Sequence, residues 1–268
     1  MNKPHYIIRG GVEGRKRLRV LSRVLHPLSV ALLRRAGART GMCCLEAGCG
    51  GGDIAIEMAR MVSAEGKVIA TDIDPAKIDI ARHEVEAAQV SNVEYRLADI
   101  TRDAFDQEFD LVHARFLLTH LPGPERALEN MRRSMRPGGV VVVEDIDIRG
   151  HFCYPDCPAF WRYVELYTET VARRGGDANV GPRLPALLEQ AGFQDIQMHV
   201  VQPAGSSGDV KLMASLTMES IREAVAAEGL ATQSEIEAVV AELRDFASTP
   251  GTVQSLPRIV QAWGWRSS

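Results

Sequence analysis

The sequence predicts a doubly wound α/β fold, in which helices cover both faces of a mostly parallel sheet. Short apolar segments alternate with segments of helical periodicity between residues 42 and 145. A run of glycines joins the first apolar segment to a helix, and several of these segments end in Asp or His. Continuously apolar strands that alternate with helices are typical of parallel sheets, and right-handed crossovers place the helices on both faces.

The expected elements follow one another along the chain. Leucines at steps of three and four predict an amphipathic helix over residues 12–36, broken near Pro27 and closed by Gly37 and Gly41. Further helices are expected over 53–62, 75–88, 125–135, 159–173, 183–190 and 212–247, the last with a break near Gly229 to Gln233. Strands are expected over 42–47, 67–71, 93–98, 109–113, 140–143, 194–201 and 253–263. Residues 205–209 are expected to form a turn, and Pro257 indicates an edge or a bulge in the last strand.

This order of elements predicts three parts. Residues 1–40 form an N-terminal helical cap, and residues 41–203 with 251–268 form a Rossmann-like core. The helical stretch 204–250 interrupts what would otherwise be a final hairpin, so we expect it to be a lid insertion. A length of 268 residues suits one large α/β domain with such an insertion.

Charge and composition narrow the function classes. The net charge of −4 argues against a dedicated nucleic-acid-binding protein, which usually carries a basic excess. Residues 3–39 are rich in Arg and Lys, with Glu13 as the only acid. We interpret this segment as a solvated helix face; a nucleic-acid or anionic-membrane patch is the alternative. No signal-peptide pattern or membrane-length apolar run occurs, so a cytoplasmic protein is expected, and the five cysteines match no metal-site spacing.

The glycine-rich segment from Glu46 to Gly52 follows the first expected strand. Its glycines allow a sharp turn and a close approach of the backbone to a ligand, and the amides of the next helix face the same space. The dinucleotide fingerprint needs a third glycine at the position of Asp53, so a dehydrogenase is disfavoured. No Lys-Ser or Lys-Thr follows, which excludes a mononucleotide P-loop.

Two acids end the second and third expected strands. Asp72 lies beside the glycine turn, where a carboxylate can accept both hydrogen bonds of a ribose diol. Asp99 is placed to accept from an adenine amino group, and Ile73 and Ile100 can cover the adenine faces. Either acid could instead cap a helix. Their occurrence at successive strand ends favours an adenosine site.

The chain resembles the class I S-adenosylmethionine-dependent methyltransferases, most closely the branch that methylates quinone precursors and natural products. The resemblance covers roughly residues 40–146 and rests on motifs in the expected order. These are Leu45-Glu46-Ala47-Gly48-Cys49-Gly50-Gly51-Gly52, Ala70-Thr71-Asp72-Ile73-Asp74, Leu97-Ala98-Asp99-Ile100, Phe109-Asp110-Leu111-Val112-His113 and Arg136-Pro137-Gly138-Gly139. It implies a seven-stranded sheet in the order 3-2-1-4-5-7-6 with the last strand antiparallel.

The resemblance also implies a role for each matching residue. Glu46 would contact the amino group of S-adenosylmethionine, Asp72 the ribose, and Asp99 the adenine. The N-terminal helix would close over the cofactor, helped by Tyr6 or Arg9. The remaining implied cofactor contacts are Gly48, Cys49, Gly50, Gly52, Ile73, Ile100 and the backbone of His113.

Methyl transfer from a sulfonium needs alignment and a dry site, and it needs a base only if the acceptor must lose a proton. His120 is our first candidate for that base and His113 the second; for each, a plain structural role is the alternative. Residues near the later strand ends are candidates for holding the acceptor. These are Arg115, Phe116, Asp145, His151, Tyr163 and Tyr167.

We expect a small organic methyl acceptor, such as a secondary metabolite or a quinone-like aromatic. Enzymes that methylate amino groups of bases or glutamine carry Asn or Asp before Pro-Pro-Tyr after the fourth strand, whereas here residues 113–116 read His-Ala-Arg-Phe. The alternatives are an RNA or protein methyltransferase, or an enzyme of this fold that keeps the cofactor without methylating. No metal, nucleic-acid or membrane partner is expected, and the sequence is compatible with a homodimer.

Overall fold

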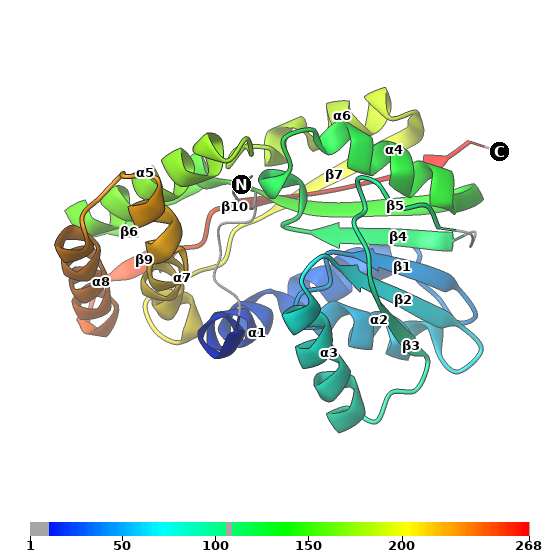
Figure 1. Cartoon of the computed structure of the whole chain (residues 1–268), viewed down its shortest axis with the longest axis horizontal. Coiled ribbons are helices and arrows are strands. Elements are labelled where there is room, and N and C mark those ends of the chain that lie inside the picture. The colour runs from blue at the N-terminus through cyan, green and yellow to red at the C-terminus, as the bar shows by residue number, and fades with distance from the viewer. Residues whose placement is uncertain (1–10, 106–108, 268) are drawn as a thin grey trace.

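The computed structural model describes residues 11–105 and 109–267. A seven-stranded sheet lies between two layers of helices, and a group of further helices covers one end of the sheet (Figure 1). The strands of the large sheet are β1 (Cys43–Ala47), β2 (Lys67–Asp72), β3 (Val93–Leu97), β4 (Phe109–Arg115), β5 (Met135–Asp147), β7 (Phe193–Val201) and β10 (Arg258–Arg266). The helices are α1 (Gly11–Arg35), α2 (Asp53–Val62), α3 (Pro75–Ala87), α4 (Pro124–Ser134), α5 (Pro158–Arg173), α6 (Leu184–Gln190), α7 (Met213–Ala227) and α8 (Gln233–Ser248).

The strand order confirms the expected fold class. The strands lie in the order β3-β2-β1-β4-β5-β10-β7. Because β7 is the sixth strand of this sheet along the chain and β10 the seventh, this order is 3-2-1-4-5-7-6. β10 pairs antiparallel with both β5 and β7, while the other pairs are parallel.

Apolar side chains from alternate positions of the strands form the two cores. On one face, Cys44, Val68 and Leu111 pack with α2, α3 and the C-terminal half of α1. On the other face, Leu45 and Val112 pack with α4 and α6. The parallel strands are buried on both faces, which is why they read as continuous apolar runs in the sequence.

The expected break near Pro27 is wrong, because α1 continues through it from Gly11 to Arg35. A proline removes one helical hydrogen bond, and the tertiary contacts that α1 makes with α2 and α7 hold it on both sides of that residue. The helix ends as expected: Gly37 has a φ of +92°, and Ala38 donates to the Leu33 carbonyl in the manner of a glycine C-cap.

The ends of several strands differ from the expected ones. β4 and β5 extend to Arg115 and Asp147, beyond the predicted ends at 113 and 143. The predicted last strand is two strands, β9 (Val253–Ser255) and β10, separated by Leu256 and Pro257. β9 joins a small sheet in the order β6-β9-β8, with β6 at Cys153–Tyr154 and β8 at Ala204–Gly205, part of which was predicted as a turn. Proline lacks the amide that would continue the ladder, so the chain changes sheets there.

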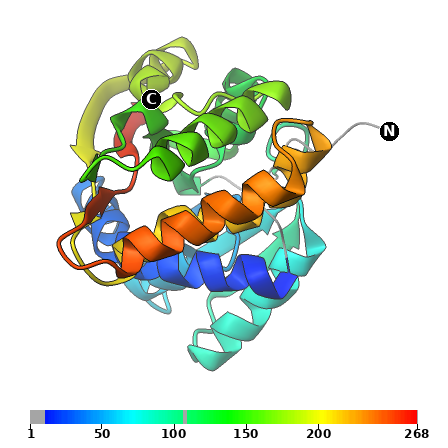
Figure 2. The same cartoon turned by 90° about the vertical axis from the view of Figure 1, so that its left-hand side faces the viewer.

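Helices α5, α7 and α8 form what we call the helical bundle, at the carboxyl end of the parallel strands. Their apolar faces share one cluster with Ile146, near the end of β5, and Ile148, just after it. Figure 2 looks onto this end, with α8 in orange nearest the viewer. The proposed lid contributes α7 and α8, and α5, assigned to the core by sequence, packs with them. No helix among residues 11–105 and 109–267 combines the length and apolarity needed to cross a bilayer.

Candidate cofactor and acceptor site

One cavity of about 920 Å³ runs from the carboxyl ends of β1, β2 and β4 to the underside of the helical bundle. Its two halves differ in chemistry. What we call the cofactor half is lined by the glycine turn and by acids at strand ends, namely Glu46, Gly48, Cys49, Gly50, Asp72 and Asp99. What we call the acceptor half is lined mainly by apolar and aromatic side chains, namely Leu18, Leu21, Tyr163, Tyr167, Met213 and Leu256. Such a cavity has room for two ligands side by side.

Three glycines of the turn line the cavity, namely Gly48, Gly50 and Gly51. Gly48 and Gly50 have φ values of +73° and +54°, a conformation that favours glycine. A Cβ on Gly50 would have no neighbour within 4 Å, so the backbone there is open to a ligand. Gly52 does not line the cavity, contrary to expectation. A Cβ on Gly52 would lie 2.5 Å from the Tyr95 hydroxyl, so this glycine permits close packing of α2.

Asp72 lies at the end of β2 with its carboxylate in the cavity wall. Its Oδ2 accepts from the Gly50 amide at 3.1 Å and lies 3.8 Å from Lys77 Nζ, and its Oδ1 accepts from the Asp74 amide at 3.0 Å. Asp74, not Asp72, caps α3, by accepting from the Ala76 amide. Each carboxylate oxygen can accept more than one hydrogen bond, so Asp72 is held in place and can still receive two hydroxyls.

The rim beside Asp72 is apolar and open. Ile73 is 62% exposed although it is a large hydrophobic side chain, and it lines the cavity with Ile100. Asp99 also lines the cavity, but its carboxylate is used within its own turn. It accepts from the amide and hydroxyl of Thr101 and from Arg102 Nε. These bonds close a turn, and no helix begins at Asp99 in the described residues up to 105, so Asp99 is not a helix cap.

Glu46 is a buried acid at the floor of the cofactor half. Burial, reinforced by the nearby charge of Asp53, raises the pKa of Glu46 well above its usual value. Its Oε2 has no hydrogen-bond partner among the described residues. A buried carboxyl oxygen without a donor can be stabilised by a ligand ammonium group.

His113 does not follow the fourth strand, as the sequence predicted, because β4 continues past it to Arg115. Its ring is fully buried, with Nε2 3.2 Å from Glu144 Oε1 and Nδ1 4.0 Å from Glu46 Oε1. The cavity wall does not include it. His113 therefore lies behind Glu46 and out of reach of a reacting atom.

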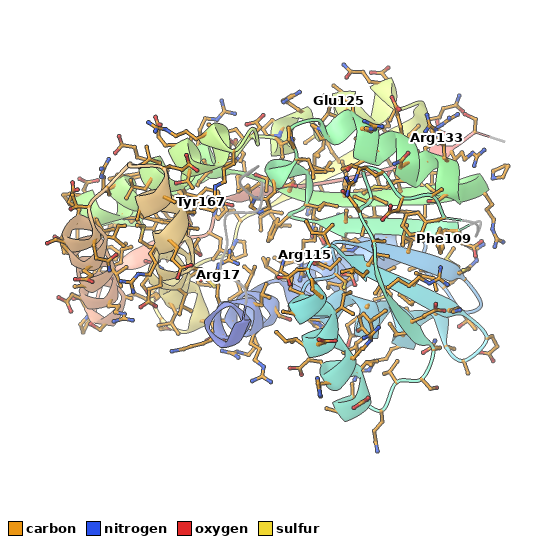
Figure 3. All side chains as sticks on the ribbon, in the orientation of Figure 1. Arg17, Phe109, Arg115, Glu125, Arg133 and Tyr167 are labelled. Atoms are coloured by element: carbon orange, nitrogen blue, oxygen red, sulfur yellow. The ribbon has the colours of Figure 1, made fainter. Side chains whose placement is uncertain are left out.

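Arg115 reaches the cavity from the end of β4 but is already paired (Figure 3). Its guanidinium lies 2.8 Å from Asp53 Oδ2 and donates to Ser29 at 3.2 Å. Burial alone would raise the pKa of Asp53, but the charge and hydrogen bond of Arg115 and a bond from Ser22 lower it. The pair fixes α1 to the start of α2, so Arg115 holds the shape of the site.

Phe116 follows β4 in the left-handed region, with a φ of +54°. This conformation is unfavourable for a bulky residue and is concentrated at functional sites. Its amide donates to the Glu144 carbonyl at 2.8 Å, and its ring contacts both the helical bundle and the cluster around α1. Phe116 therefore lies where the two halves of the cavity meet.

His120 ends a short 3-10 helix, η1 (Leu118–His120), and lines the cavity. Burial, together with the charges of Lys77 and Arg17, lowers the pKa of His120 to about 3. Asp145 was predicted to bind the acceptor, but it does not line the cavity. Its Oδ2 accepts from the Thr119 amide at 3.0 Å, so it holds η1 from behind. Burial raises the pKa of Asp145 to about 7, although backbone amides oppose this shift.

His151, Tyr163 and Tyr167 line the acceptor half. The His151 ring meets Tyr163 edge-to-face at 6.0 Å between centroids, and Tyr163 meets Tyr167 likewise at 6.4 Å. His151 Nδ1 is 2.9 Å from the Ile148 carbonyl, which requires a proton on Nδ1 and leaves Nε2 as the acceptor. Burial lowers the pKa of His151 to about 4, so the ring is neutral.

Comparison with known proteins identifies the family. Residues 38–170 match the model of a methyltransferase domain. The chain is 34% identical over 110 residues to the ubiquinone/menaquinone biosynthesis C-methyltransferase UbiE of Idiomarina loihiensis, covering 40% of this chain and 44% of that protein. These matches support a class I S-adenosylmethionine-dependent methyltransferase.

Other similarities agree with this family. An uncharacterized transposon protein of Streptomyces fradiae is 32% identical over 164 residues, covering 60% of this chain and 46% of that protein. The chain thus spans less than half the length of these two curated relatives. A solved structure from Bacillus halodurans, described as a candidate methyltransferase, has a TM-score of 0.61 at 20% identity and covers 89% of this chain and 99% of that one. At this identity the likeness shows the methyltransferase fold.

Sequence reasoning missed several polar residues of this cavity, among them Arg17 and Thr217. Arg17 was assigned to a solvated face, but it is buried and its Nε donates to Thr217 Oγ1 at 3.1 Å. Its spacing from Leu21 and Leu25 places it on the apolar face of α1, and this signal could have revealed it. Tyr6 and Arg9 lie outside the described residues. Within the described ranges, no group of three His, Cys, Asp or Glu side chains could hold a metal ion.

Proposed function

We propose that this chain transfers a methyl group from S-adenosylmethionine to a small organic molecule. The observation that carries the proposal is the single cavity with a polar half at the strand ends and an apolar, aromatic half under the helical bundle. A polar cofactor and an apolar acceptor would meet where Phe116 and His120 line the wall. Methyl transfer requires this arrangement, because the two reacting atoms must be aligned in a space without water.

The residues of the cofactor half fit S-adenosylmethionine. The open backbone at Gly50 gives room for the methionine and ribose, and the carboxylate of Asp72 is oriented to accept the ribose hydroxyls. The partnerless oxygen of Glu46 suits the amino group. The exposed face of Ile73 and the side chain of Ile100 suit the adenine, which Asp99 would contact through its remaining acceptor capacity. When bound, the cofactor supplies an electrophilic methyl group on a good leaving group.

His120 is the proposed proton acceptor for an acceptor that must lose a proton. Its pKa responds to Lys77 on the cofactor side and to Arg17 on the acceptor side, which places it between the two halves. The ring is neutral at ordinary pH, so a nitrogen lone pair is available. Its lowered pKa makes it a weak base, which suffices only for a proton that the methyl transfer itself has made acidic. His151 is the second candidate, because its Nδ1 proton is held by a carbonyl and its Nε2 is the acceptor.

The acceptor is proposed to be an aromatic or similarly flat apolar molecule. The tyrosines and His151 present ring edges and faces, and Leu18 and Met213 complete an apolar wall. The name of the Idiomarina relative, a C-methyltransferase of quinone biosynthesis, supports this class. The relatives extend beyond the matched region, so this assignment rests on the cavity in this chain.

Two measurements test the proposal. Calorimetry with S-adenosylhomocysteine should show binding by the wild-type protein. Asp72→Ala should weaken it by about 1–3 kcal/mol through lost charged hydrogen bonds. Asp79→Ala, which removes an exposed carboxylate of α3, is the matched control. Unchanged affinity in the Asp72 variant would remove that residue from the site.

The second measurement follows the methyl group itself. The protein is incubated with cell extract and S-adenosylmethionine labelled with carbon-13 in the methyl group, and the extract is separated into small molecules, RNA and protein. Label in the small-molecule fraction supports the proposal. Label confined to RNA or protein would establish the alternative acceptor. Tight cofactor binding with no labelled product would point to an enzyme of this fold that does not methylate.

A further inference from the structure

Arg17 is a buried cation with no acidic partner among the described side chains. It lines the acceptor half and is 7% exposed, and no carboxylate among the described side chains lies within 4.0 Å of its guanidinium. Its one hydrogen bond to a described residue runs from Nε to Thr217 Oγ1. Burial of an arginine without a counter-ion is costly, and proteins normally pair such a group. Arg17 therefore lies in the cavity with most of its donors available to a ligand.

The groups around Arg17 add no negative charge. Burial raises the pKa of the nearby Tyr163 hydroxyl to about 12, so this phenol stays neutral. His120 and His151 are neutral as well. The adjoining wall, with Leu21 and Leu256, is apolar. The acceptor half thus carries one positive charge that the described side chains around it do not compensate.

We propose that the methyl acceptor carries a single carboxylate, which Arg17 binds, and an apolar or aromatic body, which the tyrosine wall holds. This inference rests on the proposed methyltransferase function. The planar fork of a guanidinium matches a carboxylate with two parallel hydrogen bonds. A carboxylate brings one negative charge and neutralises Arg17. A phosphate brings nearly two, and the second would be buried without a partner.

The cofactor also carries a carboxylate, on its methionine end, so Arg17 could serve either ligand. We assign Arg17 to the acceptor because it lies on the bundle side of the cavity. The hydrogen-bond partner of Arg17 among the described residues is Thr217 of α7, and the charge of Arg17 also acts on Tyr163 of α5. The cations beside the glycine turn are Lys77, 3.8 Å from Asp72, and Arg115, paired with Asp53 at the start of α2. Figure 3 shows Arg17 and Tyr167 on the side of the helical bundle, with Arg115 toward the sheet.

The test uses the full chain saturated with S-adenosylhomocysteine. Benzoate, cinnamate and 1-naphthoate, each with its neutral amide, and phenyl phosphate are titrated by calorimetry. At least one acid should bind, and about tenfold or more tighter than its amide. Arg17→Gln should weaken that acid by about tenfold or more while affinity for S-adenosylhomocysteine stays within about threefold. Arg23→Gln, which removes an exposed α1 arginine paired with Asp209, is the control and should change neither.

Several results would overturn the inference. These are no binding of any acid, equal binding of acid and amide, preference for phenyl phosphate, or an Arg17→Gln effect on S-adenosylhomocysteine as large as that of Asp72→Ala. The last result would assign Arg17 to the cofactor. Failure of the wild-type protein to bind S-adenosylhomocysteine would instead defeat the proposed function, so the two failures are distinguishable.

Thermal unfolding separates ligand binding from a structural role. A residue kept only to tie α1 to α7 would lower the melting temperature when replaced. A buried cation kept for a ligand opposes folding of the empty protein, so Arg17→Met should leave the melting temperature unchanged or raise it. A fall of several degrees relative to Arg23→Gln would show that Arg17 is a structural tie.

Discussion

Acidification should destabilise this protein through two histidines that are buried in neutral form. The pKa of His120 is lowered from 6.5 to about 3, and that of His151 to about 4. Below about pH 6.5 the unfolded chain binds a proton at each position and the folded chain does not. The unfolded state then binds more protons, so stability falls as pH decreases. At about pH 5 the difference is roughly 1.5 pKa units for each histidine, or about 2 kcal/mol each.

Urea unfolding at about pH 7.5, 6 and 5 measures this effect as the loss of the free energy of unfolding. These two histidines should lower the free energy of unfolding of the wild-type protein by about 4 kcal/mol. Asp145, whose pKa is raised to about 7, and Glu46, whose pKa is also raised, bind protons in the folded state and oppose this loss. The test therefore compares variants: His120→Gln and His151→Gln should each lose about 2 kcal/mol less than the wild-type protein. His199→Gln, on the exposed edge strand β7, controls for the substitution itself. If His120→Gln lost as much stability on acidification as the wild-type protein, His120 would be protonated in the fold, and its assignment as a neutral proton acceptor would fail.

Three further predictions test the interior of the site. Arg115→Met should lower the free energy of unfolding in urea by about 3–5 kcal/mol, because it leaves Asp53 without its cation. Adding Asp53→Asn to the same chain should recover part of the loss, and no recovery would show that the two residues are not coupled. The raised pKa of Glu46 keeps this carboxyl protonated at low pH, so affinity for S-adenosylhomocysteine should rise with pH and binding should release a proton. In calorimetry both effects should vanish in Glu46→Gln. A pH-independent wild-type affinity would contradict this. Gly52→Ala should destabilise by about 1–3 kcal/mol, because the new Cβ would lie 2.5 Å from the Tyr95 hydroxyl and because the φ of +81° is unfavourable for any residue but glycine. Tyr95→Phe should relieve the part due to the hydroxyl; equal losses in single and double variants would leave the backbone conformation as the cause.

Much of the fold could be predicted because it is written in short stretches of sequence. Apolar runs and helical spacing predicted the sheet, and the motifs of the resemblance implied its order. The glycine turn and Asp72 were predicted to share a cavity because parallel strands end at the same edge, and they do. The exact strand ends could not be predicted: β4 continues past His113, and this shift moves that ring from the ligand space into the protein interior.

The acceptor half shows the limit of local patterns. Asp145 and His120 look equivalent in the sequence, as polar residues near strand ends, yet one supports η1 from behind and the other lines the cavity. Arg17 looks like one more base in a basic helix. It becomes a ligand candidate only when folding brings it into the cavity beside Thr217, which lies 200 positions away along the chain.

The amino-acid sequence by itself determined the sheet, the glycine turn and the acid beside it, since each depends on the chemistry of a few neighbouring residues. Tertiary structure alone decided which polar groups face the ligand and which charge is left without a partner. Those properties depend on how α1, α5 and α7 pack over the strand ends. That packing sets burial and therefore the free energy of every charge in the cavity.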